Sequence, residues 1–428
     1  MVSSSVDIGF QKTTLSNGLR ILTCNMPQTY SVSVGIFIGA GSRYESDQEA
    51  GISHFLEHML FKGTAKRPTA KEITSAIEGL GGILNAGTDR ESTVYWSRVA
   101  RPHMDIALDV LADIVRNPRF DPDEIEKERK VILEELNMIN DSPQSRVDLL
   151  IDEVFWPNQP LGRDVGGTKE SVGSLSRDQL IDYMHRQYSP SNTVISVAGD
   201  ISHGEVVEKL EPYLGDWGRT EAQPLIPAQN GQDAARLRVE RRKSEQAHIA
   251  LGVRGLPSLH PDRYALDLLS VVLGEGMSSR LFQELRERRA LAYEVHSFVQ
   301  HFLDSGAFMI YLGVDPSNAA KATEAVLEEL RKLRDGIPEE ELSSARELSK
   351  GRLMLRMEDT RAVSGWLGAQ ELLMGQVRRV DEVVAMLDSI TPEDLRRVAL
   401  QLLVSEKLNM AVVGPFRSER QFKSLLKL

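Results

Sequence analysis

The chain has 428 residues, of which 41% are hydrophobic and 26% are charged, the proportions of a soluble globular protein. This length predicts two or more domains. The formal net charge of −11 argues against nucleic acid and anionic membrane surfaces as partners. The sequence contains no apolar run of about 18 residues, the length that a membrane-spanning helix needs.

The start of the chain and its cysteine content indicate a compartment. Residues 1–7 lack both the apolar core of a secretory signal and the arginines of a transit peptide. Cys24 is the single cysteine, so no disulfide can form within the chain, and its strand-like surroundings favour a small buried hydrophobe. These features predict a cytoplasmic protein, and a matured organellar protein is also compatible with them.

The first half of the chain mixes strands with helices. β-branched stretches predict strands, and apolar residues at helical spacing predict helices. The expected strands are residues 18–23, 31–38, 93–99 and 193–200. The expected helices are a short one around residues 52–61 and longer ones at residues 69–80, 104–115 and 122–139. This pattern predicts an α+β fold, with mainly antiparallel sheets and helices packed on one face.

The short helix carries two histidines four residues apart, His54 and His58, with Glu57 between them. At helical spacing the three side chains share one face. The residues around them are apolar, so we expect this helix to be buried. A lone buried histidine is more often a hydrogen-bonded core residue than a ligand. Two imidazoles on one face can instead hold zinc, with the carboxylate as the base beside the open position.

A catalytic zinc takes three protein ligands. The long helix at residues 122–139, with Asp121 as its N-cap and Pro122 in its first turn, is the best place for the third. Two adjacent acids, Glu134 and Glu135, compete for this role. The first shares its helical face with charged residues, and the second shares its face with the apolar residues Val131, Ile132, Met138 and Ile139.

A ligand must face inward, so the helical spacing favours Glu135 over Glu134. Glu128 lies two turns before Glu135 on the same face. We expect it to support the site or to serve as a reserve ligand.

The sequence also contains an internal duplication. Three pairs of matching positions share nearly one offset, 215 or 216 residues: Leu180 and Leu395, Val197 and Val412, Pro122 and Pro338. We therefore expect two homologous halves, residues 1–217 and 236–428. Residues 218–235 are rich in Pro, Gly, Gln and Ala without periodicity, and they are expected to be a linker.

The histidine helix is not repeated. The corresponding segment of the second half, residues 263–273, is apolar but contains no histidine. The duplicated fold therefore does not require His54, Glu57 and His58, which favours a functional role for them.

Two segments carry a resemblance to a known family. Residues 51–64, Gly-Ile-Ser-His-Phe-Leu-Glu-His-Met-Leu-Phe-Lys-Gly-Thr, closely resemble the pitrilysin-type zinc peptidases, in the branch of the mitochondrial processing peptidase β subunit and its bacterial relatives. H-x-x-E-H is the inverted form of the H-E-x-x-H zinc motif. Residues 126–135 resemble the family segment that carries the distal glutamate ligand. The resemblance covers essentially the whole chain, including the duplication.

The resemblance implies roles for five residues of the first half. One Zn²⁺ per chain would be bound by His54, His58 and Glu135. Glu57 would be the base that takes a proton from water, and Glu128 would be a supporting acid.

The resemblance also implies substrate contacts. By pattern alone, residues 274–293 are a Gly-rich turn, an amphipathic helix and a strand. In the family, however, an Arg and a Tyr seven apart reach toward the metal, and Arg286 and Tyr293 match them. Tyr293 would donate to the oxyanion and Arg286 would bind a substrate carbonyl. Asn85 and Ala86 match edge-strand positions that pair with the peptide backbone.

The implied function is a zinc metalloendopeptidase that hydrolyses extended, unfolded peptides in a chamber between two halves. Two alternatives stay open: a non-catalytic scaffold or binding subunit, and a catalytic subunit active only with a partner chain. A scaffold has no need to keep Glu57. The family's inactive partner carries a flexible Gly-rich loop, and no long glycine run occurs here. The chain therefore resembles the catalytic member of a heterodimer or a self-sufficient homodimer.

Overall fold

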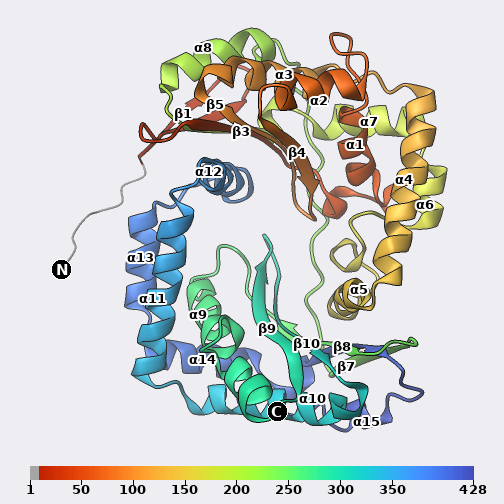
Figure 1. The fold of residues 1–428 in the computed structure, drawn as a ribbon, viewed down its shortest axis with the longest axis vertical. Helices are drawn as coiled ribbons and strands as arrows, with labels where there is room; N and C mark the ends of the chain where they lie inside the picture. Colours follow the sequence, from red (N-terminus) through yellow and green to blue (C-terminus); the bar gives the residue numbers. More distant parts are fainter. Residues whose placement is uncertain (1–8) are drawn as a thin grey trace. The chain divides into compact units, whose positions relative to one another are not determined.

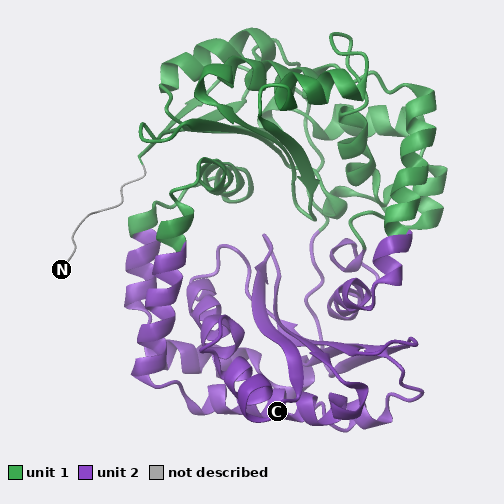
Figure 2. Cartoon of the chain, viewed as in Figure 1, with its two compact units in different colours: residues 1–136, 164–226, 353–381 green, residues 137–163, 227–352, 382–428 purple. Residues whose placement is uncertain are grey.

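The computed structural model describes residues 9–428. The chain forms two compact units, each built on its own β-sheet (Figures 1 and 2). Unit 1 comprises, of the described residues, 9–136, 164–226 and 353–381. Unit 2 comprises residues 137–163, 227–352 and 382–428. The expected α+β class is confirmed.

The sheet of unit 1 has six strands in the order β1-β2-β6-β3-β5-β4. The strands are β1 (Phe10–Thr14), β2 (Arg20–Asn25), β3 (Ser31–Ile38), β4 (Ile83–Thr88), β5 (Thr93–Ala100) and β6 (Thr193–Gly199). Neighbours are antiparallel except β2 and β6, which are parallel. The central strand β6 is buried along its whole length, whereas β4 pairs with β5 alone and is an edge strand.

The helices of unit 1 pack on its sheet or beside the helices that lie on it. They are α1 (Ile52–Leu60), α2 (Ala70–Glu78), α3 (Met104–Arg116), α4 (Pro122–Asp141, which continues into unit 2), α6 (Lys169–Ser174), α7 (Arg177–Gln187), α8 (His203–Leu214) and α12 (Thr360–Met374). The start of α4 follows the predicted cap, because Asp121 Oδ1 accepts the backbone N–H of Asp123 at 3.0 Å.

The sheet of unit 2 has five strands in the order β7-β11-β8-β10-β9, and its one parallel pair is β7 and β11. The strands are β7 (Arg236–Arg241), β8 (Ala247–Arg254), β9 (Ala292–His301), β10 (Gly306–Val314) and β11 (Asn409–Gly414). The helices are α5 (Pro143–Phe155), α9 (Arg263–Gly274), α10 (Ala319–Asp335), α11 (Glu339–Arg356), α13 (Val380–Ser389), α14 (Pro392–Leu402) and α15 (Arg420–Lys423).

The two sheets repeat one topology, which confirms the two homologous halves. Arg20 of β2 and Arg236 of β7 start corresponding strands 216 residues apart, as do Ser31 of β3 and Ala247 of β8. The order β2-β6-β3-β5-β4 in unit 1 corresponds to β7-β11-β8-β10-β9 in unit 2. Residues 218–235, the expected linker, contain no helix or strand.

The compact units do not follow the halves of the sequence, because each contains one helix from the other half. Helix α5 comes from the first half and packs against β8 and β11 in unit 2. Helix α12 comes from the second half and packs against β3 and β6 in unit 1. Thr360 and Ser33 share a hydrogen bond of 2.9 Å, and Ser364 Oγ donates to the backbone oxygen of Ser196 at 2.8 Å. The division of roles between residues 1–217 and 236–428 stays a prediction.

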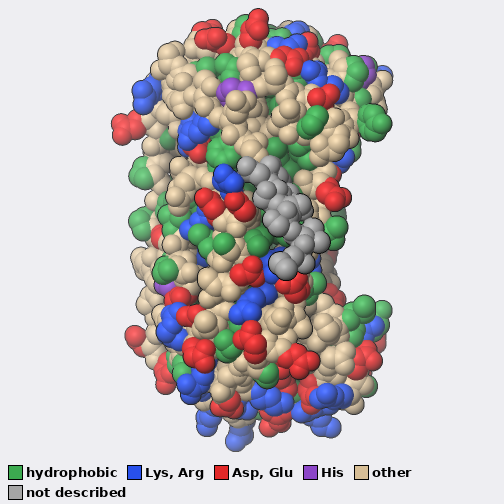
Figure 3. Space-filling view, turned by 90° about the vertical axis from the view of Figure 1, so that its left-hand side faces the viewer, with side chains coloured by type: hydrophobic (Ala, Val, Ile, Leu, Met, Phe, Trp, Pro, Cys, Tyr) green, Lys and Arg blue, Asp and Glu red, His purple; other side chains and the backbone are tan. Residues whose placement is uncertain are grey.

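The single cysteine is buried, as its strand-like surroundings predict. No helix within residues 9–428 combines the length and the apolar character that crossing a membrane requires. On the face drawn in Figure 3, acidic and basic side chains are interspersed. Cys24 is buried in β2, where burial raises the pKa of its thiol to about 11, as expected for an inert core cysteine.

The packing of α12 gives a test of the exchanged helix. A Cβ added at Gly368 would lie 2.2 Å from the ring of Phe37 on β3, whereas one added at Gly365 of the same helix would meet open space. We expect Gly368→Ala to lower the free energy of unfolding of the unit by about 1–3 kcal/mol through overpacking. The matched control Gly365→Ala should be neutral or stabilising by up to about 1 kcal/mol. Chemical denaturation measures both, and equal effects would contradict this packing.

Candidate metal centre and active site

Helix α1 is held at its start by a buried carboxylate. Glu45 accepts the backbone N–H groups of Gly51 and Ser53, both at 2.9 Å, and thus caps a helix end that has no side-chain cap of its own. Gly51 has a φ of 90°, and a Cβ there would lie 2.5 Å from the backbone oxygen of Gly166. The backbone at this point therefore requires glycine.

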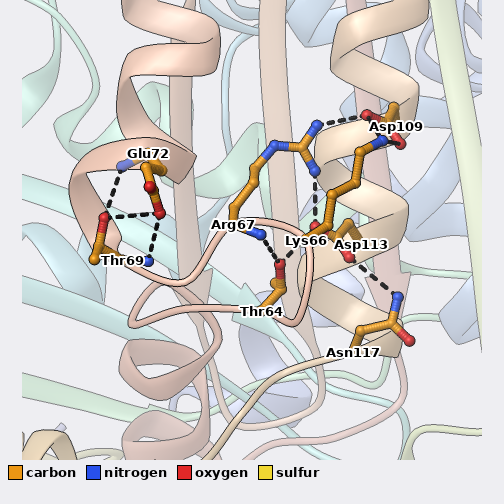
Figure 4. Close-up of polar contacts among 8 residues, drawn as sticks. All are labelled: Thr64, Lys66, Arg67, Thr69, Glu72, Asp109, Asp113 and Asn117. Carbon is orange, nitrogen blue, oxygen red and sulfur yellow. Dashed lines mark hydrogen bonds and ion pairs between the residues drawn. The ribbon is translucent and has the colours of Figure 1, made fainter.

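The loop after α1 is fixed by an ionic network (Figure 4). Thr64 Oγ1 donates to Asp113 Oδ2 at 2.7 Å, and Arg67 bonds both Asp113 and Asp109 of α3. Lys66 donates to both oxygens of Asp109 at 2.8 and 2.7 Å. Burial alone would raise the pKa of Asp109, but the bonds from Lys66 and Arg67 hold it below its usual value. Both ends of the histidine helix are therefore anchored.

Three side chains converge between α1 and α4. Nε2 of His54 and Nε2 of His58 are 3.3 Å apart. Glu135 Oε2 lies 3.8 Å from the former and 3.6 Å from the latter. Within residues 9–428 these three residues form the one group of His, Cys, Asp and Glu side chains close enough to hold a metal ion. Glu135, the acid that the helical spacing favours, lies close to both histidines.

The spacing of these three atoms fits zinc. Ligand atoms at about 2.0–2.1 Å from a tetrahedral ion lie roughly 3.3–3.4 Å from one another. The distance between the two nitrogens has this value, and the distances to the carboxylate are a few tenths of an ångström longer. Burial and the nearby His58 lower the pKa of His54 to about 4, so this imidazole is neutral and able to coordinate at pH 7.

Glu128 orients His58 from the side opposite the cluster. Its Oε2 lies 3.0 Å from His58 Nδ1, and its Oε1 accepts from Lys62 at 2.5 Å. Burial opposes protonation of His58, but Glu128 and then the charges of Glu135 and Glu57 outweigh it and raise the pKa of His58. A carboxylate on the far ring nitrogen is the usual partner of a metal-binding histidine.

Glu57 lies beside the cluster and is held by the edge strand. Thr88 Oγ1, at the end of β4, donates to Glu57 Oε2 at 2.6 Å. Burial is the main cause that raises the pKa of Glu57 above its usual value. A carboxylate with a raised pKa next to a metal site suits a group that must take and release a proton.

The stripe of α4 that carries Glu135 differs from the expectation in one respect. Val131 and Met138, which we expected to face inward, are 44% and 66% exposed. The buried stripe of α4 is instead Ile125, Glu128, Ile132 and Leu136. Glu135 lies at its margin, half-buried and close to both histidines. Glu134 is exposed.

Asn85 and Ala86 lie on β4. Since β4 pairs with β5 alone among the described strands, its other edge is available to a further strand. Asn85 is exposed, and its Oδ1 accepts the backbone N–H of Ala86 at 2.7 Å.

Arg286 and Tyr293 are brought together in unit 2. Arg286 lies in a π-helical segment, Phe282–Arg288, and its guanidinium carbon is 4.9 Å from the ring centroid of Phe282 and 5.2 Å from that of Tyr293. Tyr293 is 76% exposed near the start of β9. Single π-turns are frequent at functional sites.

Three contributors to the site have no signal in the sequence. Glu45 caps α1 from outside the helix, Thr88 approaches Glu57 across 31 positions, and Lys62 bonds a residue of another helix. A capping pattern looks for Ser, Thr, Asp or Asn just before the helix, and here that position is Gly51. The closeness of Thr88 depends on the packing of β4 against α1, which only the fold determines.

Family models match most of the chain. The insulinase model of peptidase family M16 matches residues 20–169, and the model of the inactive domain of peptidase M16 matches residues 174–349. The chain is 38% identical to an uncharacterized zinc protease of Mycobacterium leprae over 98% of its length and 95% of that protein. It is 39% identical to an uncharacterized zinc protease of Bacillus subtilis, over 94% of the chain and 97% of that protein.

Solved structures share the fold. A protease from Helicobacter pylori superposes with a TM-score of 0.89 at 24% identity, covering 95% of this chain and all of that one. A structure described as a peptidase M16 inactive domain, from Pseudomonas fluorescens, gives a TM-score of 0.87 at 21% identity, covering 96% of this chain and 99% of that one. With both halves matched in order and the relatives aligned nearly end to end, the chain belongs to peptidase family M16, the insulinase or pitrilysin-type family.

Proposed function

We propose that the protein is a zinc metalloendopeptidase acting on extended peptides. The observation that carries this proposal is the convergence of His54, His58 and Glu135 beside Glu57, a carboxylate that belongs to α1 but is not part of the ligand group. The curated relatives aligned along nearly the whole chain are described as zinc proteases, which supports the same conclusion.

The residues present divide the work of peptide hydrolysis between them. His54, His58 and Glu135 would hold the zinc, which when bound supplies the Lewis acidity that polarises a substrate carbonyl and acidifies water. Glu57 takes a proton from the attacking water and returns it to the nitrogen of the departing amine. The hydroxyl of Thr88 fixes the carboxylate for both transfers. Glu128 keeps His58 oriented.

The edge strand β4 suits an extended substrate. A peptide that pairs with β4 as an added strand gives up its own fold and reads main-chain groups, so unfolded segments are favoured over compact domains. The last residue of this strand, Thr88, donates to Glu57, so the end of β4 lies next to the proposed base. From the family resemblance we further propose that Tyr293 and Arg286 serve the same reaction, as donor to the oxyanion and as ligand of a substrate carbonyl.

A scaffold subunit is the rival function. Residues 174–349, which run from the end of the first half into the second, match a model described as an inactive domain, and the helix of the second half that corresponds to α1 has no histidine. The first half, however, keeps the two histidines, Glu135 and a Glu57 tied to Thr88. A scaffold would have no use for a proton acceptor beside a group of metal ligands.

The choice of metal ligand is tested by two neighbouring variants. We expect Glu135→Gln to lose most of the zinc, because an amide is a much weaker zinc ligand than a carboxylate. Glu134→Gln is the matched control, with the same chemical change one position away on the exposed face, and it should retain about one zinc per chain. Metal analysis of the purified proteins measures both, and the reverse result would assign the ligand to Glu134.

The role of Glu57 is tested by Glu57→Gln. We expect zinc content to be unchanged and peptide turnover to fall by at least about 100-fold, because the amide cannot accept the proton of water. Cleavage of an unfolded peptide by the isolated chain measures turnover. Cleavage by the variant at the wild-type rate would rule out the mechanism, and an inactive wild-type chain that holds zinc would favour the scaffold or partner-dependent alternatives.

The contribution of the second half is tested with Tyr293→Phe. If the hydroxyl donates to the oxyanion, we expect kcat to fall by about 100-fold with zinc content unchanged. Arg286→Ala should in addition raise KM, because it removes a contact with the bound peptide. Exposed Arg396→Ala on α14 is the control for loss of a charge in the second half. Wild-type kinetics in both site variants would show that this pair has only a structural role.

A further inference from the structure

A second polar site lies in unit 1, on the face of the sheet covered by α12. A pocket of about 500 Å³ is lined by residues of β3, β5, β4 and the segment 356–369. Its charged lining residues are Arg356, Asp359 and Arg361. None of these three residues is one of the candidate metal ligands or contacts them.

The acid in this pocket is fully engaged. Asp359 Oδ1 accepts the backbone N–H of Ala362 at 2.9 Å, and Oδ2 accepts from Arg98 at 2.9 Å. Within residues 9–428, neither of the two guanidinium groups, those of Arg356 and Arg361, has a hydrogen bond or ion pair with a carboxylate. The pocket therefore carries an excess of positive charge.

Arg361 is fixed although it has no acidic partner. Its guanidinium carbon lies 3.7 Å from the ring centroid of Trp96 on β5, a stacked arrangement that leaves the N–H donors at the edge of the guanidinium plane available. A pre-oriented planar donor group of this kind matches a carboxylate, which can accept two parallel hydrogen bonds from it.

The pocket faces the edge at which a peptide would add. On β4, Asn85 is paired with Trp96, and Gly87 is paired with Val94, so these residues share the pocket face of the sheet. Gly87 has no side chain, and a Cβ there would meet nothing within 4 Å. A strand added beside β4 would lie about 4.7–4.9 Å away, and its alternate side chains would point to this same face.

We infer that this pocket, formed around Arg361 and Trp96, is a specificity site for an acidic side chain of the peptide substrate. A Glu or Asp of the added strand passes over Gly87 and places its carboxylate on the guanidinium of Arg361, with Arg356 adding to the positive field. This inference rests on the proposed peptidase function and adds a substrate class to it: extended peptides with an acidic residue at one fixed position from the cleaved bond.

The test uses the full-length zinc-loaded chain and a positional peptide set with Glu, Gln or Lys at each position around a cleaved bond. In the wild type we expect kcat/KM to be about tenfold higher for Glu than for Gln at one position, the usual size of a charge-assisted hydrogen bond in a partly exposed site. Arg361→Gln should reduce this ratio to within about twofold, and Arg361→Glu should turn the preference toward Lys. Arg361→Lys, which keeps the charge, should retain part of the preference.

Lys71→Gln is the matched control, because it removes one exposed positive charge from α2, which packs on β4 but does not line the pocket. It should keep the wild-type ratio. The same peptides are also titrated against the zinc-loaded Glu57→Gln protein, so that a chain that cleaves nothing still reports the Glu-to-Gln ratio of Kd. Equal use of Glu and Gln at every position in both measurements, or a preference that survives in Arg361→Gln, overturns the inference.

Discussion

The site depends on the placement of α1 beside α4, which brings one nitrogen of each of two imidazoles and one carboxylate oxygen within 3.8 Å of one another. Such a group is unfavourable by itself, since three polar side chains lose water together. Contacts around the site hold the three side chains together. Glu45 fixes one end of α1, and the ion pairs of Arg67 fix the loop after its other end. Glu128 fixes the imidazole ring of His58. A metal ion bound by these three side chains would offset the free-energy cost of holding them close together.

Local patterns in the sequence indicated which side chains the structure brings together. Two histidines at helical spacing and a carboxylate on the matching face of a second helix are properties of neighbouring residues, and the structure brings His54, His58 and Glu135 together as those patterns indicate. The duplication was also readable, because equal offsets survive divergence. Thr88 and Lys62 were not predictable, because their partners are set by how a strand and a second helix pack on α1.

The exchanged helices show a different limit of sequence reasoning. The two halves of the chain share one topology, and the pattern of apolar residues indicates that α5 and α12 each have one buried face. It does not tell against which sheet, because the corresponding strands of the two units, β3 and β6 in one and β8 and β11 in the other, are buried alike. The close approach of Gly368 to Phe37, which a side chain at that position would prevent, shows how specific the chosen contact is.

The same exchange gives the second half a direct part in the first sheet. Helix α12 covers β3 and β6 and carries Arg361. Arg361 stacks on Trp96, which belongs to the first half. Side chains of α12 can therefore change without disturbing the candidate metal ligands, which lie on other helices. The candidate metal ligands thus lie on α1 and α4, whereas Arg361 lies on a helix encoded some 300 residues later, since α1 starts at Ile52 and α12 at Thr360.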